Sequence, residues 1–437
     1  MKFGTDGIRG LANKELTPEL VQRLGHAAAA TIDGQRFIVA RDPRRSGTMI
    51  ESALAAGMAA GGVDVELVGV MPTPALALLS ATESVPAAMV SASHNPAADN
   101  GIKLFATGGR KLTDQMQADI EAAMAHNDVP AEVPTGANVG VVRHRSDAGT
   151  SYIDALAASV SGETFPVELK VVFDCANGAA SGFAGTIATR LGLDAVIIAD
   201  QPDGLNINDG CGSTHLDVVA KAVVDHGADI GLALDGDADR VLGVTETGER
   251  FDGDQIMAML AADMLARGVL RNQSVVVTVM TNLGFRLAMR ERNIHVVETP
   301  VGDRHVLEAL AAGNHSLGGE QSGHVILPDY ATTGDGLLTA VQILALMART
   351  AEPISRLVDN AMTRLPQTLV NVAVAGNAKD HLSEIESLVS EVQAEFGDDG
   401  RVLVRASGTE PVIRVMAEAR SAEAAGNAVD RIVEALK

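Results

Sequence analysis

Short apolar runs alternate with amphipathic stretches along most of the chain, which predicts alternating strands and helices. Near the N-terminus, the apolar runs 37–40, 63–68 and 87–90 predict strands, whereas the stretches near 46–60 and from Pro74 predict helices. Such alternation is typical of a parallel sheet with helices on its faces, and ligands of such sheets gather at the carboxyl ends of the strands.

The alternation restarts twice after a soft boundary at 126–146, which is rich in Pro, Gly and Asn and lacks a helical period. Helices are predicted at 153–160, past Gly182, at 216–226, 255–266 and 285–292, and strands at 171–174, 195–198, 230–234, 241–244, 275–279 and 296–299.

The last part of the chain has a different order. After a predicted helix at 334–347 and two prolines, strands are predicted at 369–374, 402–406 and 412–417, and helices at 382–396 and 422–436. A chain of 437 residues is too long for one ordinary core. We therefore predict an α/β protein with three successive α/β domains at 1–146, 147–248 and 249–365, and a smaller α+β domain at 366–437.

Composition narrows the class of partner. Aromatic residues make up 3% of the chain and Trp is absent, which argues against base-stacking platforms. The formal charge of −22 argues against a nucleic acid or an anionic membrane. An anionic substrate would require a local cluster of Arg and Lys, with a divalent cation, to override this field.

The N-terminus and the cysteines bear on the compartment. Cys175 and Cys211 are the only cysteines and form no CxxC pair, which indicates buried thiols in a reducing compartment. Met1 leads directly into Lys2 without an apolar segment, and no run of about 18 apolar residues occurs. We expect a soluble, cytoplasmic protein.

The loop SASHNP, residues 91–96, follows an apolar strand, and 101–105 reads as the next strand. Such a loop holds a hydroxyl in the open. Ser93 beside His94 suggests a hydrolase, but adjacent residues in extended backbone point to opposite faces, and no G-x-S-x-G elbow is present. Taken alone, a polar turn between strands is the simpler interpretation.

DGDADR, residues 235–240, lies between two apolar runs. Carboxylates at i, i+2 and i+4 of an extended segment lie on one face, so three acids would converge on a hard divalent cation such as Mg²⁺. Glu246 fits the twelfth position of an EF-hand loop. However, Arg240 stands where an EF-hand requires glycine, which argues against a calcium loop of that type. An acidic hairpin tip is the alternative.

Other motifs are weaker by themselves. GTDGIRG, residues 4–10, is either a glycine-rich turn or a way to hold Arg9 near a phosphate. GGEQSGH, residues 318–324, is either a tight turn or a loop that bonds sugar hydroxyls. RASGTEPVIR, residues 405–414, has the parts of a phosphate cradle but also fits a polar hairpin. The charge run RDPRR, residues 41–45, is typical of a solvated turn, so we assign it no role.

In this order, the motifs resemble the functional loops of the α-D-phosphohexomutases, in their bacterial, glucosamine-type version. SASHNP with the later NGIK resembles the active-site serine loop, DGDADR the metal loop, GEQSGH the sugar-binding loop and RASGTEPVIR the phosphate-binding loop. Ala97 and Ala98 depart from the pattern, in which we expect bulkier residues beside the serine.

The resemblance implies a mutase that interconverts glucosamine 6-phosphate and glucosamine 1-phosphate, toward UDP-N-acetylglucosamine and cell-wall precursors. The domains would surround a central cleft, and a bisphosphorylated sugar would serve as intermediate and activator. Ser93 would be the phosphoserine. One Mg²⁺ per chain would bind the Ser93 phosphate and the three acids of the metal loop, namely Asp235, Asp237 and Asp239.

The resemblance also implies roles for the remaining site residues. Ser93, Lys103, Arg9 and His94 would be catalytic, with Lys103 either a general base or a plain electrostatic clamp. The substrate-binding set would be Arg240, Asp303, Arg304, Glu320, Ser322, Arg405, Ser407, Gly408, Thr409 and Arg414.

Two alternatives remain. The chain could act on mannose or glucose phosphates within the same superfamily, or it could be a phosphosugar-binding protein that has lost catalysis. We expect a small phosphosugar as the partner, with no nucleic acid and no membrane. The family further suggests a homodimer and, for the first phosphorylation of the serine, a priming kinase.

Overall fold

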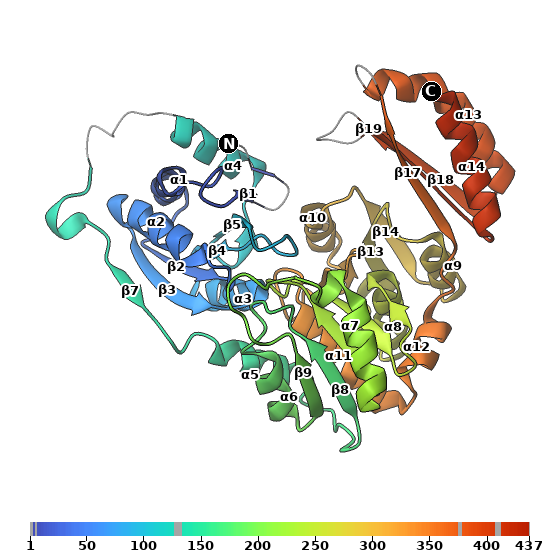
Figure 1. Cartoon of the computed structure of the whole chain (residues 1–437), viewed down its shortest axis with the longest axis horizontal. Coiled ribbons are helices and arrows are strands. Elements are labelled where there is room, and N and C mark those ends of the chain that lie inside the picture. Colours follow the sequence, from blue (N-terminus) through green and yellow to red (C-terminus); the bar gives the residue numbers. More distant parts are fainter. Residues whose placement is uncertain (1–2, 5–6, 126–132, 375–377, 407–411, 437) are drawn as a thin grey trace. The chain divides into compact units, whose positions relative to one another are not determined.

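The structure, a computed structural model, describes residues 3–4, 7–125, 133–374, 378–406 and 412–436 (Figure 1). The chain forms two compact units. The first consists of Met1–Met280 and Ile294–Asn360, and the second consists of Thr281–Asn293 and Ala361–Lys437. A short segment from the middle of the chain therefore folds with the C-terminal part.

The first α/β domain is built on a mixed sheet with the strand order β1-β5-β4-β2-β3-β7, and β6 pairs with β5. Strands β4, β2, β3 and β7 are parallel, whereas β5 is antiparallel to both β4 and β1. The elements are β1 (Ile8–Leu11), α1 (Pro18–Thr31), β2 (Arg36–Arg41), α2 (Gly47–Ala60), β3 (Asp64–Val70), α3 (Thr73–Glu83), β4 (Ala87–Val90), β5 (Asp99–Ala106), β6 (Arg110–Lys111), α4 (Asp114–Ala125) and β7 (Val142–His144).

The second sheet has the order β12-β11-β10-β8-β9, in which β9, β8 and β10 are parallel and β11 and β12 are antiparallel. Its domain contains α5 (Thr150–Ala158), β8 (Lys170–Asp174), α6 (Ala184–Leu191), β9 (Asp194–Ile198), α7 (Leu216–His226), β10 (Ile230–Leu234), β11 (Val241–Thr245) and β12 (Arg250–Phe251). Because β10 is fully buried and pairs with β11, residues 235–240 form the turn between them.

The third sheet has the order β14-β13-β15-β16. Its elements within the first unit are α8 (Gly253–Ala266), β13 (Ser274–Thr278), β14 (His295–Thr299), α10 (Asp303–Gly313), β15 (Gly318–Gly319), β16 (Val325–Ile326) and α11 (Gly336–Thr350), and α12 (Ile354–Ala361) leads to the second unit. Among the described residues, no helix by itself meets the length and hydropathy of a membrane span, and the sharply bent pair α11 and α12 meets them jointly.

The second unit is an antiparallel sheet, β17-β19-β18, with helices α13, α14 and α9. The elements are α9 (Leu283–Glu291), β17 (Gln367–Ala373), α13 (Ala378–Phe396), β18 (Gly400–Ala406), β19 (Val412–Ala419) and α14 (Ala422–Ala435). Glu418 on β19 is fully buried, accepts the Leu283 N–H over 2.9 Å and pairs with Arg401. These bonds tie α9 to the sheet.

The predicted α/β class is confirmed, with three mixed sheets followed by a small α+β domain. The two cysteines are buried and free, as expected. Helices α1, α4, α10 and α12 and strands β1, β6, β7, β12, β15 and β16 were not predicted. Pro353 lies just before α12, and its carbonyl accepts the Arg356 N–H over 3.1 Å.

Close packing of α1 on α2 leads to a stability prediction. A Cβ at Gly57 would lie 2.0 Å from the Gln22 carbonyl oxygen, so Gly57→Ala should force the helices apart and destabilise the first domain by about 2 kcal/mol or more. At Gly426 in α14, nothing lies within 4 Å of an added Cβ, and Gly426→Ala should stabilise its helix by about 0.5–1 kcal/mol. Native-state hydrogen exchange reads each helix separately, and equal effects of the two substitutions would contradict the prediction.

Candidate active site

Ser93 lies in the turn that follows β4, with its backbone in the left-handed region at φ 53°. Its Oγ donates to Asp235 Oδ2 over 2.7 Å and lies 3.2 Å from His94 Nδ1. The expectation of an open hydroxyl is wrong, because Ser93 is fully buried. The turn 235–240 covers it so closely that a Cβ at Gly236 would lie 2.5 Å from the Ser93 carbonyl oxygen. Glycine at 236 therefore allows the two loops to meet.

The two serines of the loop have different environments. Ser91 Oγ donates to Asp42 Oδ2 over 2.6 Å and accepts the Ser93 N–H over 3.0 Å. Ser91 therefore supports the loop, and Ser93 faces the acids. The expectation that 41–45 is a solvated turn is wrong, because Asp42 and Arg44 are buried and paired over 2.9 Å. Their mutual neutralisation is what allows two charges inside the domain.

Asp235, Asp237 and Asp239 are all buried, and one carboxylate oxygen from each lies within 4.8 Å of the others. The predicted convergence is therefore present, but its geometric reason was wrong. The segment is not extended: Ala238 has φ 59° and its N–H donates to the Asp235 carbonyl, so a turn gathers the acids. Among the described residues, Asp237 Oδ1 and Asp239 Oδ1 are buried without a hydrogen-bond partner, although Asp239 Oδ1 lies 3.7 Å from Arg240 Nε and 3.8 Å from His324 Nδ1. Orphaned carboxylate oxygens of this kind fit a hard divalent cation.

The charges around the acids differ from one carboxylate to the next. Burial, followed by the negative charges of Asp239 and Asp237, raises the pKa of Asp235. Burial would also raise the pKa of Asp239, but Lys103, His324 and Arg240 together lower it. A cation bound by this group would oppose that rise in the pKa of Asp235.

Lys103 Nζ lies 2.8 Å from Asp237 Oδ2 and 3.0 Å from Asp239 Oδ2. Two carboxylates at this distance stabilise the ammonium form, which suits an electrostatic clamp in this state. Thr73 also holds Asp237: its Oγ1 donates to Oδ2 over 2.6 Å and its N–H to the backbone carbonyl over 2.9 Å. Sequence reasoning missed Thr73, since no motif marks it.

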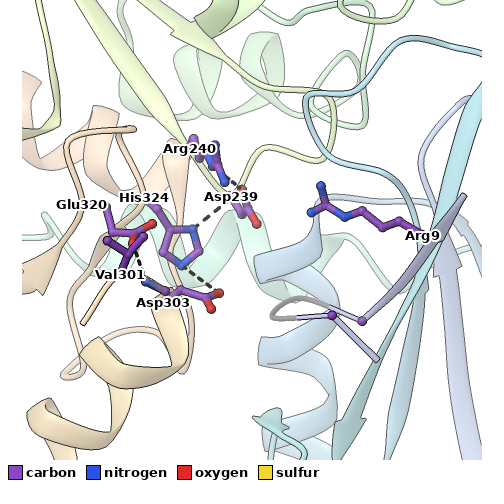
Figure 2. Close-up of a pocket in the computed structure, with 10 residues that line it drawn as sticks. Arg9, Asp239, Arg240, Val301, Asp303, Glu320 and His324 are labelled. Carbon is purple, nitrogen blue, oxygen red and sulfur yellow. Dashed lines mark hydrogen bonds and ion pairs between the residues drawn. The ribbon is translucent and has the colours of Figure 1, made fainter. Parts of the chain in front are cut away.

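A pocket of about 430 Å³ opens beside these residues (Figure 2). Figure 2 shows Arg9 extending from β1 toward Asp239 and Arg240. Gly7 allows β1 to lie close to its neighbour, because a Cβ there would be 2.3 Å from the Ile102 carbonyl oxygen. The lining residues are Gly4, Gly7, Arg9, Asp239, Arg240, Val301, Gly302, Asp303, Glu320 and His324.

The opposite wall of the pocket comes from the third domain. Glu320 Oε1 accepts the Gly302 N–H over 3.1 Å. His324 lies between Asp239 and Asp303, with nitrogen to oxygen distances of 3.8 Å and 3.7 Å. Burial would lower the pKa of His324, but Asp239 and then Asp303 raise it. Sequence reasoning gave His324 no role, although the motif G-E-x-S-G-H contains it.

The other candidates of this domain are placed differently. Asp303 lines the pocket and pairs with Lys111, whereas Arg304 pairs with Asp114 and, over 3.0 Å, with Glu308. Ser322 Oγ is buried without a hydrogen-bond partner. Neither Arg304 nor Ser322 belongs to the described lining of this pocket.

In the second unit, Arg405 on β18 and Arg414 on β19 are directly opposite each other. Burial and the Arg414 charge lower the pKa of Arg405, and Arg414 Nε is buried with no hydrogen-bond partner among the described residues. Like charges placed opposite each other are unfavourable unless an anion joins them. Ser407, Gly408 and Thr409 lie outside the described residues.

The environment of His94 leads to a pH prediction. Burial, then Arg240 and Arg9, lower its pKa to about 4, whereas an unfolded histidine titrates near 6.5. Between these values the unfolded chain binds more protons, so wild-type stability should fall as the pH drops from 6.5 toward 4. His94→Gln has no imidazole to titrate, so the free energy of unfolding of this variant should rise relative to that of the wild type as the pH drops from 6.5 toward 4. Denaturant unfolding of both unphosphorylated proteins at pH 7 and pH 5 tests this, and a pH-independent difference would contradict it.

Family comparisons cover nearly the whole chain. Four models of phosphoglucomutase/phosphomannomutase match: alpha/beta/alpha domain I at residues 1–130, domain II at 150–248, domain III at 252–365 and the C-terminal domain at 369–435.

Individual proteins agree with the family models. A phosphoglucosamine mutase of Rhodococcus erythropolis is 50% identical over 99% of this chain and 98% of its own length. A phosphoglucomutase/phosphomannomutase family protein of Burkholderia thailandensis has a TM-score of 0.81 at 27% identity, covering 99% of this chain and 96% of that one. Aspergillus fumigatus N-acetylphosphoglucosamine mutase, in complex with GlcNAc-6P and magnesium, shares the fold with a TM-score of 0.69 at 20% identity, covering 100% and 95%.

Proposed function

Because the chain belongs to the phosphoglucomutase/phosphomannomutase family, we propose that it is an isomerase that interconverts glucosamine 6-phosphate and glucosamine 1-phosphate. The observation that carries this proposal is the burial of the Ser93 hydroxyl 2.7 Å from Asp235, within a turn that also brings Asp237 and Asp239 to Lys103. The relative at 50% identity, named phosphoglucosamine mutase, favours the amino sugar.

The chemistry requires Ser93 to carry a phosphoryl group. A free sugar hydroxyl attacks the phosphorus, the bond to Ser93 Oγ breaks, and a sugar bisphosphate forms. The bisphosphate then reorients within the site. Ser93 Oγ attacks the phosphorus at the other position, the bond from that phosphorus to the sugar oxygen breaks, and the isomeric monophosphate is released. Positioning and charge neutralisation supply most of the catalysis in such a transfer.

The acid trio, which consists of Asp235, Asp237 and Asp239, would hold Mg²⁺ together with the Ser93 phosphate. When bound, the ion neutralises charge on the phosphoryl oxygens. The orphaned Oδ1 atoms of Asp237 and Asp239 support this assignment, and so does the magnesium named in the Aspergillus complex.

The charged residues of the pocket fit the remaining tasks. Arg9, Arg240 and His94 would steady the transferring group, and Lys103 would either accept the hydroxyl proton or remain a clamp. Glu320 and Ser322 would bind sugar hydroxyls, and Asp303 would complete that wall. Arg405 and Arg414, with residues 407–409 between them in sequence, would hold the phosphate that is not transferred.

The cellular setting follows from the same proposal. A cytoplasmic enzyme that supplies glucosamine 1-phosphate would serve the synthesis of UDP-N-acetylglucosamine. A bisphosphorylated sugar would restore the phosphoserine whenever it is lost, a kinase would be an alternative primer, and a homodimer would be the assembly.

A substrate comparison tests the proposal. The purified protein, with Mg²⁺ and glucose 1,6-bisphosphate, is assayed on the 6-phosphates of glucosamine, mannose and glucose. We expect glucosamine 6-phosphate to give a kcat/KM at least about tenfold above the others, because buried polar groups matched to one substituent reject its analogues. Faster turnover of mannose or glucose phosphate would reassign the substrate, and turnover of none would leave a phosphosugar-binding protein.

A further inference from the structure

The guanidinium of Arg44 donates to the serine loop, to Asp99 at the start of β5 and to Asp42. Its Nη2 donates to the carbonyl oxygens of Ser93 and Asn95 over 3.0 and 2.8 Å. Its Nη1 donates to the carbonyl oxygens of Asp99, over 3.2 Å, and of Pro96. Arg44 is 1% exposed and its bond to the buried Ser93 carbonyl lies in the interior, whereas the bonds to Asn95, Pro96 and Asp99 are partly buried. The Arg44 side chain therefore donates to four backbone carbonyl groups between Ser93 and Asp99.

Asn208 reaches the same turn from the second domain. Its Nδ2 donates to the carbonyl oxygens of Ser93 and Asn95 over 2.9 and 3.1 Å. Its own N–H donates to the Ala176 carbonyl over 2.9 Å, which anchors it beside the second sheet. A Cβ at Gly236 would lie 2.8 Å from Asn208 Nδ2, so Asn208 also touches the metal loop. Arg44 and Asn208 thus share two acceptors from opposite sides.

These contacts fix a backbone that is unfavourable by itself. A serine in the left-handed region is disfavoured by about 1–2 kcal/mol, and it persists where its surroundings over-determine it. A buried arginine is tolerated only when its donors are satisfied, as they are for Arg44. The geometry maintained at this cost is the approach of Ser93 Oγ to Asp235.

We propose that Arg44 and Asn208 are positioning residues for phosphoryl transfer. Both residues hold the backbone carbonyl of Ser93, so that the Ser93 side chain stays directed at Asp235, Asp237 and Asp239. Neither residue lines the described pocket, so they act through Ser93 and leave sugar binding to other groups. This inference rests on the proposed function of Ser93 as phosphate carrier.

The test uses Arg44→Lys, which keeps the charge beside Asp42 but lacks the fork, and Asn208→Ala, which removes two bonds. Matched controls are Arg41→Lys on the same turn, where Arg41 pairs with Glu51, and Asn206→Ala in the same segment as Asn208. Readouts are kcat, KM for glucosamine 6-phosphate, and the rate at which glucose 1,6-bisphosphate phosphorylates Ser93, followed by intact mass.

We expect both variants to lose about 10- to 100-fold in kcat and in phosphorylation rate, with KM within about twofold, and the controls to match the wild type. Folded variants that are phosphorylated at the wild-type rate would overturn the inference. Equal losses in the control variants, or a change in KM as large as the change in kcat, would also overturn it. If Arg44→Lys does not fold, Asn208→Ala decides by itself. A wild-type protein that never gains phosphate would overturn the proposed function as well, which distinguishes the two failures.

Discussion

Ser93→Ala should lower mutase turnover by at least about 10⁴-fold, since the substitution removes the oxygen that carries the phosphoryl group. The fold should survive. The lost hydroxyl donates to Asp235 and contacts His94 Nδ1 over 3.2 Å, while the carbonyl of residue 93 remains held by Arg44 and Asn208. The measurement is turnover of glucosamine 6-phosphate, together with the mass of the protein after incubation with glucose 1,6-bisphosphate.

The neighbouring serine provides the control. Ser91→Ala removes the bond to Asp42 and the acceptor of the Ser93 N–H, but it leaves the oxygen that receives phosphate. It should therefore slow turnover and still gain one phosphoryl group. Phosphate on the Ser93→Ala protein at the wild-type stoichiometry would show that another residue carries it.

The serine loop and the metal loop could be placed by sequence because each lies between two apolar runs. The runs 230–234 and 241–244 became β10 and β11, so 235–240 had to be a turn at a strand end, where parallel sheets bind ligands. The convergence of three acids was predicted from an extended segment. That geometry was wrong, because Ala238 adopts the left-handed conformation within a turn.

Contacts between segments that are distant in the sequence could not be predicted. The bond from Thr73 to Asp237 joins residues from two domains, and no local pattern marks Thr73 as a partner of an acid. Arg44 was set aside as part of a solvated charge run, since sequence cannot show that five backbone and side-chain acceptors surround it. Residues 281–293 join the C-terminal unit through Glu418, again a long-range bond.

Asp237→Asn should raise the Mg²⁺ concentration that half-saturates activity by about 10- to 100-fold and lower kcat as well. Thr73 Oγ1 and Lys103 Nζ both donate to Asp237 Oδ2. An amide in this place would turn its oxygen toward these two donors. Its NH₂ group would then occupy the position of Oδ1, which is the buried and unpartnered oxygen suited to a cation. The substitution would thus remove a charge and also set a donor where the ion requires an acceptor.

The measurement has two parts. Activity is titrated with Mg²⁺, and binding of Mn²⁺ to the same proteins is followed by electron paramagnetic resonance, which does not depend on turnover. Asp225→Asn is the control: this aspartate lies on α7 and pairs with the exposed Lys221, so it should alter neither curve. Weaker binding with Asp237→Asn alone would assign the carboxylate to the cation. Lower activity with an unchanged Mn²⁺ isotherm would instead assign Asp237 to Lys103, because neutralising that carboxylate removes one of the two ion pairs that hold the ammonium.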